Sequence, residues 1–329
     1  MKSGNMSKLY LVTGASGHLG STLVKKLMER KEKIRVFVLP QEKERIPEGI
    51  EVVTGDITDK ESLRPFFNKE GYDSVSLIHV AGLVSLVSRN NPLVWKVNVD
   101  GTRNVLELSM EYGIDRFVYI SSVDVIPEKK YPQLMSEVDH FSIDEREGDY
   151  ARSKAVASQL VLDYADKGLN ASMVQPSAII GPGDDANSNH AIRMIRLLNK
   201  WPIPFYTDGA YDFVDVRDVA EGILLCEEKG KIHECYILSG EYITVEELVS
   251  YIRSLHGKKK ALFKIPLGIV KAFAPLIEKI CLMAGNRHPA ITPYSIDTLA
   301  SACAYTHLKA TQQLGYEHRD IKQTIKDSI

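Results

Sequence analysis

The chain has 329 residues, of which 44% are hydrophobic and 26% are charged, and its formal net charge is −2. These values are typical of a folded protein with one large or two modest domains. So small a net charge indicates neither an electrostatic surface for nucleic acid nor a basic helix for anionic lipid. The opening segment, MKSGNMSKLYLVTG, has no long apolar run and no cleavage-site pattern, so we expect no signal peptide and a cytoplasmic protein.

The spacing of the cysteines argues against a metal centre. They stand far apart, at Cys226, Cys235, Cys281 and Cys303, and form no Cys-x-x-Cys pair. We therefore expect free thiols in a reducing compartment and no metal site.

Strand-like and helix-like patterns alternate from residue 8 to residue 177. Strands are expected at 8–13, 33–39, 49–55, 74–82, 115–122 and 170–177, and helices at 18–30, 58–70, 91–113 and 151–168. Thr58 and Glu61 have the spacing of a capping box at the start of the second helix. The alternation predicts βαβ units and a parallel sheet of the α/β class, and the near-continuous apolarity of the strands predicts helices on both of its faces.

A glycine-rich turn, LVTGASGHLG, joins the first strand to the first helix. Gly14, Gly17 and Gly20 are spaced as G-x-x-G-x-x-G. Glycine suits a turn that needs positive φ and a backbone that must approach a pyrophosphate, which the helix N-terminus would then bind. A tight strand–helix turn without any ligand is the alternative interpretation of the same glycines.

Further motifs follow the glycine turn in a fixed order. They are GDITD (55–59), HVAG (79–82), NVDGTRNVLE (98–107), YISS (119–122), YARSK (150–154), QPSAIIGPGD (175–184) and FVDVRDVAEGI (213–223). Together they resemble the extended short-chain dehydrogenase/reductase family, of the NAD-dependent epimerase/dehydratase type, over roughly residues 8–255. With PAITPYSIDTL (289–299), the tail is similar to the dihydroflavonol reductase and hydroxysteroid dehydrogenase side of that family.

The resemblance implies a division of the chain. We expect a doubly wound Rossmann-type domain that binds a dinucleotide over residues 1–180, with segments near 213–240 joining the edge of its sheet. The interruptions by proline and glycine beyond residue 180 indicate a smaller, mainly helical substrate-binding region over 181–329.

The resemblance also assigns roles to residues. Ser122, Tyr150 and Lys154 would be catalytic, with Ser121 as the competing serine. A lone Tyr-x-x-x-Lys pair is a weak signal, but positions i and i+4 share one helix face, and a nearby ammonium lowers the pKa of a phenol toward the range useful for proton transfer. The residues implied to bind the cofactor are Gly14, Ser16, Gly17, His18, Leu19, Gly20, Leu39, Asp56, Ile57, Val80, Ala81, Gly82, Tyr150, Lys154, Pro176 and Ser177. His79 and Asn98 are expected to be structural.

The end of the second strand bears on cofactor choice. NAD sites usually place an acid there and NADP sites an Arg nearby. Leu39 stands at that place; Lys43 and Arg45 follow, but so do Glu42 and Glu44. The absence of an acid at the strand end tilts the expectation from NAD to NADP. An exposed charged loop that does not discriminate between the two is the alternative.

Two positions bear on the substrate. Tyr211 and Asp212 stand where sugar-nucleotide enzymes usually carry an Arg, and Val123 and Asp124 stand where dehydratases place Asp-Glu; Asp124 is interpreted as an ordinary loop residue. We expect a reductase or dehydrogenase that acts on a carbonyl or secondary alcohol of a mainly apolar small molecule, as a homodimer. A sugar-nucleotide epimerase or dehydratase, and a cofactor-binding sensor without turnover, are the alternatives.

The segment ALFKIPLGIVKAFAPLIEKICLMAG (261–285) has a wide apolar face. Lys264, Lys271 and Glu278 recur every seven residues and predict one narrow polar face. Its charges and prolines argue against a membrane span. Core packing of a helical lid is the default interpretation; a lid over an apolar substrate and peripheral membrane contact are the alternatives.

Overall fold

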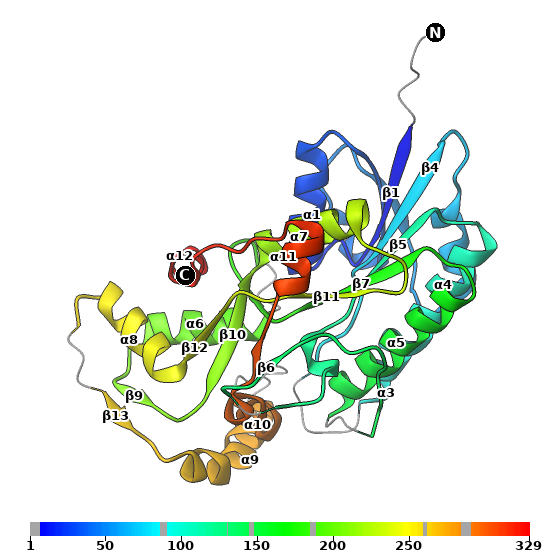
Figure 1. Cartoon of the computed structure of the whole chain (residues 1–329). Coiled ribbons are helices and arrows are strands. Elements are labelled where there is room, and N and C mark those ends of the chain that lie inside the picture. The colour runs from blue at the N-terminus through cyan, green and yellow to red at the C-terminus, as the bar shows by residue number, and fades with distance from the viewer. Residues whose placement is uncertain are drawn as a thin grey trace.

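A seven-stranded parallel sheet lies at the centre of the molecule (Figure 1), with the strand order β11-β7-β5-β4-β1-β2-β3. The computed structural model describes residues 7–85, 91–129, 131–144, 148–184, 189–258, 262–283 and 291–329. The strands are β1 (Lys8–Thr13), β2 (Lys33–Val38), β3 (Glu51–Thr54), β4 (Ser74–His79), β5 (Arg116–Ile120), β7 (Ala171–Pro176) and β11 (Cys235–Leu238). The chain winds outward from β1 in both directions, which makes this the predicted doubly wound Rossmann-type sheet.

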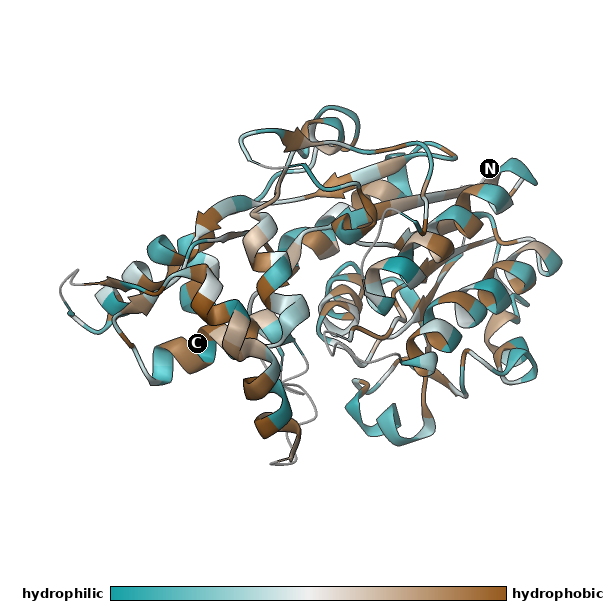
Figure 2. Cartoon of the chain, turned by 90° about the horizontal axis from the view of Figure 1, so that it is seen from below, coloured by the Kyte–Doolittle hydropathy of each residue, from teal (hydrophilic) through white to brown (hydrophobic). Residues whose placement is uncertain are grey.

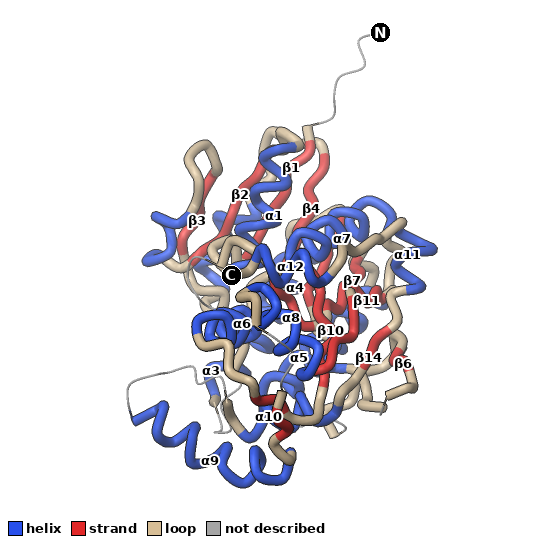
Figure 3. The backbone as a smooth tube through the Cα atoms, turned by 90° about the vertical axis from the view of Figure 1, so that its left-hand side faces the viewer, coloured by secondary structure: helices blue, strands red, loops and turns tan. Residues whose placement is uncertain are grey.

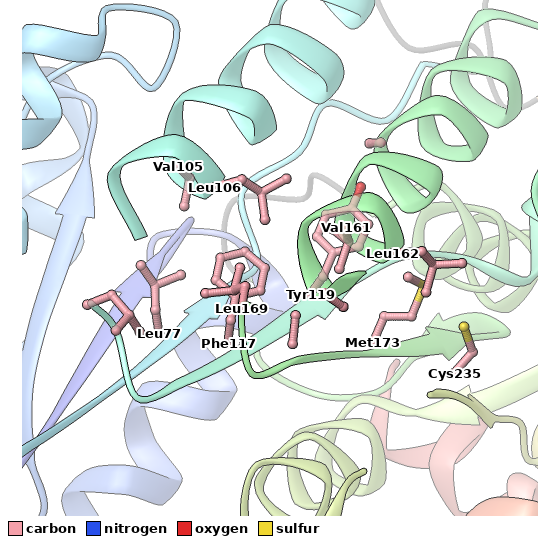
Figure 4. Packing of buried hydrophobic residues seen from close by; sticks show 14 of the residues in the cluster. Leu77, Val105, Leu106, Phe117, Tyr119, Val161, Leu162, Leu169, Met173 and Cys235 are labelled. Carbon is pink, nitrogen blue, oxygen red and sulfur yellow. The ribbon is translucent and has the colours of Figure 1, made fainter. Parts of the chain in front are cut away.

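Helices cover both faces of this sheet (Figure 3). On one face lie α1 (His18–Glu29), α7 (Val216–Lys229) and α11 (Leu308–Leu314), and on the other α4 (Thr102–Glu111) and α5 (Asp149–Asp166). Neighbouring residues of β5 alternate between the two: Phe117 packs with the α4–α5 layer, whereas Val118 packs with the α1–α7 layer. Figure 4 shows the first of these layers, where Phe117 lies on the side of Leu106, and Tyr119 lies beside Val161. Burial of both faces explains why the strands are apolar throughout.

Two predicted helices differ from expectation. In the segment 58–70, α2 spans only Lys60–Leu63, and a 3₁₀ turn over Arg64–Phe67 follows it. The predicted cap by Thr58 is wrong: Asp59 is the N-cap, and its carboxylate accepts a hydrogen bond from the backbone N–H of Glu61 at 3.1 Å. Pro65 has no N–H to continue the helical ladder, which shortens the helix.

The predicted helix over 91–113 is helical but not uniform. It begins with α3 (Pro92–Trp95), continues as a π-helix over Lys96–Gly101 and ends with α4. Gly101 in the wider section packs on Ile57, whose Cδ1 would lie 2.7 Å from a Cβ at that glycine. Such π-helical insertions often occur beside functional sites.

A second region extends beyond the carboxyl edge of the main sheet. Its three-stranded sheet has the order β12-β10-β8. Its elements are β8 (Ala178–Ile180), α6 (His190–Lys200), β10 (Ala210–Asp215), β12 (Glu241–Thr244), α8 (Val245–Leu255) and α12 (Ile321–Asp327), joined by the short pairs β9 (Phe205–Tyr206) with β13 (Phe263–Lys264) and β6 (Leu134–Met135) with β14 (Ala304–Tyr305). The division of the chain into two domains stays a prediction.

Two further helices form the lower end of the molecule in Figure 1: α9 (Leu267–Met283) and α10 (Pro293–Ser301). Interpretation of α9 as core is wrong, because only Ala274 and Glu278 of this helix are buried. The prediction that Glu278 lies on an exposed polar face of this helix is also wrong, because Glu278 is buried. In the described part of the chain, every helix is too short or too polar to span a membrane.

Candidate active site

The glycine turn lies between β1 and α1, as predicted, and its three glycines meet different demands. Gly14 has a φ of +69°, and a Cβ there would lie 2.6 Å from the backbone nitrogen of Ala81. A Cβ at Gly20 would lie 2.0 Å from the carbonyl oxygen of Gly14. At Gly17 the nearest atom to a Cβ is 3.6 Å away. The fold therefore requires Gly14 and Gly20, whereas Gly17 leaves space open in front of the helix.

Gly17 is also the N-cap of α1, and no side chain caps the helix there. The first N–H groups of a helix have no partner within the helix and attract anions. A cavity of about 360 Å³ lies beside this end, lined by Ser16, Gly17, His18, Ser21, Arg45, Gly183 and Asp184. An uncapped helix end, an open glycine and an arginine suit a bound pyrophosphate. Leu19 and Gly20, in the first turn of α1, are buried.

A buried histidine fastens the glycine turn to the neighbouring strand end. His79 Nδ1 is 2.7 Å from Thr13 Oγ1, and His79 Nε2 is 3.1 Å from Thr102 Oγ1. Thr13 Oγ1 in turn accepts from the backbone N–H of Ala81 at 3.2 Å. Burial, and then the charge of Lys154, lower the pKa of His79 to about 3. The ring is therefore neutral at pH 7 and structural, as predicted.

Asn98 is also structural, as predicted. Its side-chain amide binds both backbone groups of Leu83, accepting from the N–H at 2.7 Å and donating to the carbonyl at 3.1 Å. It also donates to Ser153 Oγ of α5 at 3.0 Å. The loop after β4, which carries Val80, Ala81 and Gly82, is thereby held against α5.

The second and third strands end beside the glycine turn in the sheet order. Leu39 follows β2 directly, half-buried, and starts a 3₁₀ turn over Pro40–Arg45. Glu42 of this turn accepts from the backbone N–H of Leu39 at 3.2 Å, so its carboxylate serves as a cap. After β3, Asp56 is exposed and Ile57 is buried under the π-helical segment.

The two serines after β5 point to different neighbours. Ser121 Oγ lies 2.6 Å from Ser158 Oγ in the interior. Ser122 Oγ accepts from the backbone N–H of Asp124 at 3.2 Å and lies close enough to Tyr150 to lower the pKa of its hydroxyl. The geometry therefore brings Ser122, and not Ser121, to Tyr150.

Tyr150 and Lys154 lie one turn apart at the start of α5. Burial, and then the charge of Asp124, raise the pKa of the Tyr150 hydroxyl, while Ser122 opposes this shift. The ammonium of Lys154 donates to the Ile120 carbonyl at 2.5 Å and to the Tyr119 hydroxyl at 3.1 Å. Burial lowers its pKa to about 7. Lys154 Nζ would also lie 3.6 Å from a Cβ at Gly82, so the small residue after β4 keeps space open next to the lysine.

The loop after β7 carries the remaining predicted residues. Pro176 ends β7, and the N–H of Ser177 donates to the Leu238 carbonyl at 3.2 Å; both residues are buried. Asp212 of β10 is buried too, and its carboxylate accepts from the N–H groups of Gly240 at 3.3 Å and Tyr305 at 3.2 Å. Burial raises its pKa to about 6.

Three side chains near Tyr150 were not assigned to the site from the sequence. Burial and then the charge of Asp124 raise the pKa of Tyr294 and of Tyr305, so both hydroxyls lie near this carboxylate. The ring of Tyr294 also closes over Gly148, where a Cβ would meet it at 2.6 Å. Asp124, expected to be an ordinary loop residue, therefore lies close enough to Tyr150 for its charge to raise the pKa of that hydroxyl. Tyr294 lies within the segment PAITPYSIDTL (289–299), but nothing in that segment linked it to Tyr150, and Tyr305 lies outside the motifs.

Comparisons with known proteins agree with this geometry. The family model of the NAD dependent epimerase/dehydratase family matches residues 10–237. A putative dihydroflavonol 4-reductase from a Synechocystis species is 31% identical over 98% of this chain and 94% of its own length. Sterol demethylase protein B from Methylococcus capsulatus is 31% identical over 97% and 96%. The crystal structure of gox2253 superimposes with a TM-score of 0.81 at 30% identity, covering 97% of this chain and 96% of that one.

The fold and the site thus define a nicotinamide-dependent enzyme of the extended short-chain dehydrogenase/reductase type. The chain belongs to the NAD-dependent epimerase/dehydratase family. Its relatives include a farnesyl-quinoline-oxide ketoreductase from Stigmatella aurantiaca, 27% identical over 97% of this chain and 94% of that protein. A UDP-glucose 4-epimerase structure shares the fold, with a TM-score of 0.74 at 20% identity over 97% of this chain and 96% of that one.

Proposed function

We propose that this enzyme transfers hydride between a nicotinamide cofactor and a carbonyl or secondary alcohol of a mainly apolar small molecule. The observation that carries the apolar substrate is the environment of residues 211 and 212. Tyr211 stacks on Phe213 with ring centroids 5.1 Å apart and packs against the cluster of Ala274, Ile296 and Leu299 beneath α9 and α10. Asp212 is buried and bonded to two backbone N–H groups. This position therefore offers no cation to a sugar-nucleotide pyrophosphate.

We assign the proton-transfer work to Tyr150. The nicotinamide, when bound, supplies or accepts the hydride. In the direction of reduction, the Tyr150 hydroxyl gives its proton to the substrate oxygen; in oxidation, the phenolate takes it back. Ser122, which lies beside Tyr150, orients that oxygen. A charge on Lys154 favours the phenolate, whereas burial and the charge of Asp124 raise the pKa of Tyr150.

A substrate panel tests this reading. Apolar ketones, aldehydes and secondary alcohols are offered with each cofactor, next to UDP- and dTDP-sugars. We expect net oxidation or reduction of an apolar compound, followed by the absorbance of the reduced nicotinamide. Conversion of a sugar nucleotide to its epimer without net cofactor change would overturn the proposal in favour of an epimerase. Cofactor binding without turnover of any compound would favour a sensor.

The preference for NADP over NAD that we propose rests on Arg45. No acid stands at the end of β2, and the nearby Glu42 caps its own 3₁₀ turn. Arg45 lines the cavity beside Ser16 and Gly17, where a ribose 2′-phosphate would add a favourable charge. An arginine–phosphate contact contributes about 1.5–3 kcal/mol, or roughly 10- to 100-fold in affinity.

Fluorescence titration distinguishes the cofactors. Arg45→Ala should weaken NADPH binding by roughly 10-fold or more and leave NADH binding unchanged. Lys43→Ala, in the same 3₁₀ turn but outside the lining of the cavity, is the matched control and should alter neither. A wild type that prefers NADH, or equal losses in both variants, would overturn the choice of NADP.

We also propose a cytoplasmic homodimer. All four cysteines are free thiols, which suits a reducing compartment. The dimer rests on the resemblance to the family, and sedimentation velocity at micromolar concentration would detect a monomer if this expectation is wrong.

A further inference from the structure

The first turn of α10 is fixed by its own cap. Thr292 Oγ1 accepts from the backbone N–H of Ser295 at 3.0 Å, and Ser295 Oγ accepts from the backbone N–H of Thr292 at 2.9 Å. Both residues are buried. Pro293 follows at a position of the helix that needs no N–H. This reciprocal pair therefore fixes the backbone that carries Tyr294.

Helix α10 packs into the molecule through side chains other than Tyr294. Ile296 and Leu299 are buried and form a cluster with Ala274 of α9. Figure 2, seen from the side of the molecule on which α9 lies, colours much of α9 as hydrophobic. Tyr294 precedes Ile296 by two residues and Leu299 by five, so its side chain leaves the helix on another face. Truncation of Tyr294 should therefore leave the packing of α10 on α9 intact.

The Tyr294 ring lies against the start of α5. Gly148, the N-cap of that helix, has a φ of +77°, and a Cβ there would lie 2.6 Å from Cε2 and 3.0 Å from Cδ2 of Tyr294. Gly148 precedes Tyr150 by two residues. After burial, the charges of Asp124 and then Tyr150 raise the pKa of the Tyr294 hydroxyl, which agrees with this proximity. The glycine therefore lets an aromatic ring from α10 reach the turn that carries Tyr150.

We propose that Tyr294 determines substrate specificity: its ring forms the wall of the substrate site on the side of α10 and admits only a small group, a hydrogen or a methyl, on that side of the reacting carbon. This inference rests on the function proposed above, because it takes Tyr150 as the residue that binds the reacting oxygen. The substituents of the carbon bonded to that oxygen lie close to Tyr150, so the one that points toward Gly148 meets the ring. The preferred substrates are therefore aldehydes and methyl ketones, or the corresponding alcohols, whose larger apolar group lies on the other side.

A series of phenyl ketones tests this wall. Acetophenone, propiophenone and isobutyrophenone differ only in the alkyl group, which grows from methyl to isopropyl. A methylene in an apolar pocket changes specificity by about 10- to 200-fold, so kcat/KM of wild type should fall by at least about tenfold from acetophenone to isobutyrophenone. Tyr294→Ala should remove most of this difference by improving isobutyrophenone. Tyr294→Phe, which keeps the ring, should retain it.

A larger ring separates specificity from misfolding. Tyr294→Trp should lower kcat/KM for propiophenone and isobutyrophenone below the wild-type values while acetophenone is still reduced. Opposite shifts in the alanine and tryptophan variants cannot come from a common loss of folded protein. Tyr251→Ala is the matched control: Tyr251 lies on α8 and donates its hydroxyl to the Lys322 carbonyl at 2.9 Å, so its truncation should leave the preference among the ketones unchanged.

The outcomes distinguish this inference from the function on which it rests. A wild type that binds cofactor but turns over no apolar carbonyl compound would overturn both. A wild type that reduces compounds of the panel without preferring acetophenone within the series would overturn the inference alone. So would equal preferences in wild type and all three Tyr294 variants, or an equal change in Tyr251→Ala and Tyr294→Ala, which would indicate a general loosening of the fold.

Discussion

At the scale of single residues, Tyr150 and Lys154 are assigned different tasks. Tyr150→Phe removes only the hydroxyl, so cofactor binding should persist while turnover falls by about 10²–10⁴-fold, the usual loss for a general acid–base. Lys154→Met should weaken both, because Lys154 Nζ lies next to the loop at Gly82 and is proposed to favour the Tyr150 phenolate. Binding is measured by fluorescence titration and turnover with a substrate from the panel.

A conservative control for the tyrosine lies on the same helix. Tyr164→Phe, at a partly buried position packed on the α4–α5 layer, should leave turnover unchanged. If Tyr150→Phe behaved like Tyr164→Phe, the pair would be ordinary helix residues and the proposed chemistry would be wrong.

His79 predicts a specific dependence of stability on pH. The folded pKa of about 3 lies below the ordinary 6.5, so between these values the unfolded chain binds a proton that the folded chain cannot. Stability should therefore fall as the pH drops from about 6.5 toward 3, with a slope of up to about 1.4 kcal/mol per pH unit from this residue. His79→Asn should lower stability at pH 7 and flatten the slope between pH 6 and 4.

Urea titration at several pH values measures the slope. Because carboxylates also titrate in this range, the difference between wild type and His79→Asn is the quantity that counts. Parallel curves for the two proteins would mean that the His79 ring takes up a proton without unfolding.

How far the sequence predicts the site differs from residue to residue. Ser122, Tyr150 and Lys154 lie in motifs, and the structure brings Ser122 close to Tyr150. The choice between Ser121 and Ser122 needed the structure. The side chains of adjacent residues at the end of a strand point in different directions, and the sequence does not show which of them faces Tyr150. Tyr294 and Tyr305 escaped prediction because only tertiary folding brings them to Asp124.

At the scale of elements, two glycines of the same turn are expected to differ in role: Gly20 is needed for folding, and Gly17 for binding of the cofactor. Gly17 is extended with a φ of −79°, and the nearest atom to a Cβ there is 3.6 Å away. Gly17→Val should therefore fold normally but block the helix end and abolish stabilisation by the cofactor. In wild type, cofactor at 100 times its Kd should add about 2.7 kcal/mol.

Gly20→Val provides the contrast within the same turn. Its Cβ would lie 2.0 Å from the Gly14 carbonyl oxygen, so this variant should lose stability even without cofactor. Thermal melts with and without cofactor separate the two effects. A Gly17→Val protein that still gains the full stabilisation would show that the turn does not hold the pyrophosphate.

Elements differ in how well their patterns predict them. The buried strands were placed to within a few residues, since continuous apolarity bounded by turns is a strong signal. The second helix was predicted too long because Pro65 outweighs the capping pattern. Helix α9 was predicted to be core because an apolar pattern reports hydrophobicity without reporting what covers it.

At the scale of the whole molecule, Asp215 connects the start of α7 to the C-terminal helix α12. It caps α7, accepting from the N–H of Arg217 at 2.7 Å, and its other oxygen accepts from Thr324 Oγ1 of α12 at 2.8 Å. Arg217 also pairs with Asp327 at 2.7 Å. Asp215→Ala removes a cap and leaves buried partners unmatched, so we expect a loss of about 3 kcal/mol.

Asp320→Ala is the matched control for this change. Asp320 is likewise an N-cap, of α12, but it is exposed, and its carboxylate accepts from the N–H of Gln323 at 3.0 Å. Its loss should cost about 1 kcal/mol. Urea unfolding followed by circular dichroism compares the two; equal losses would mean that Asp215 contributes as a cap alone.

The pairing of β6 with β14 has a consequence for how such an enzyme can diversify. Thr306, just after β14, donates its N–H to the Met135 carbonyl of β6 at 2.9 Å. This bond holds the C-terminal segment that contains β14 against the segment that follows Ser122. The assigned proton-transfer residues all precede this tail, while Tyr294 and Tyr305 belong to it. Descendants of this chain can therefore acquire new substrates through changes in residues 291–305 while the proposed proton-transfer residues stay unchanged. The condition is that the pairing of β6 with β14 still holds the changed segment in place.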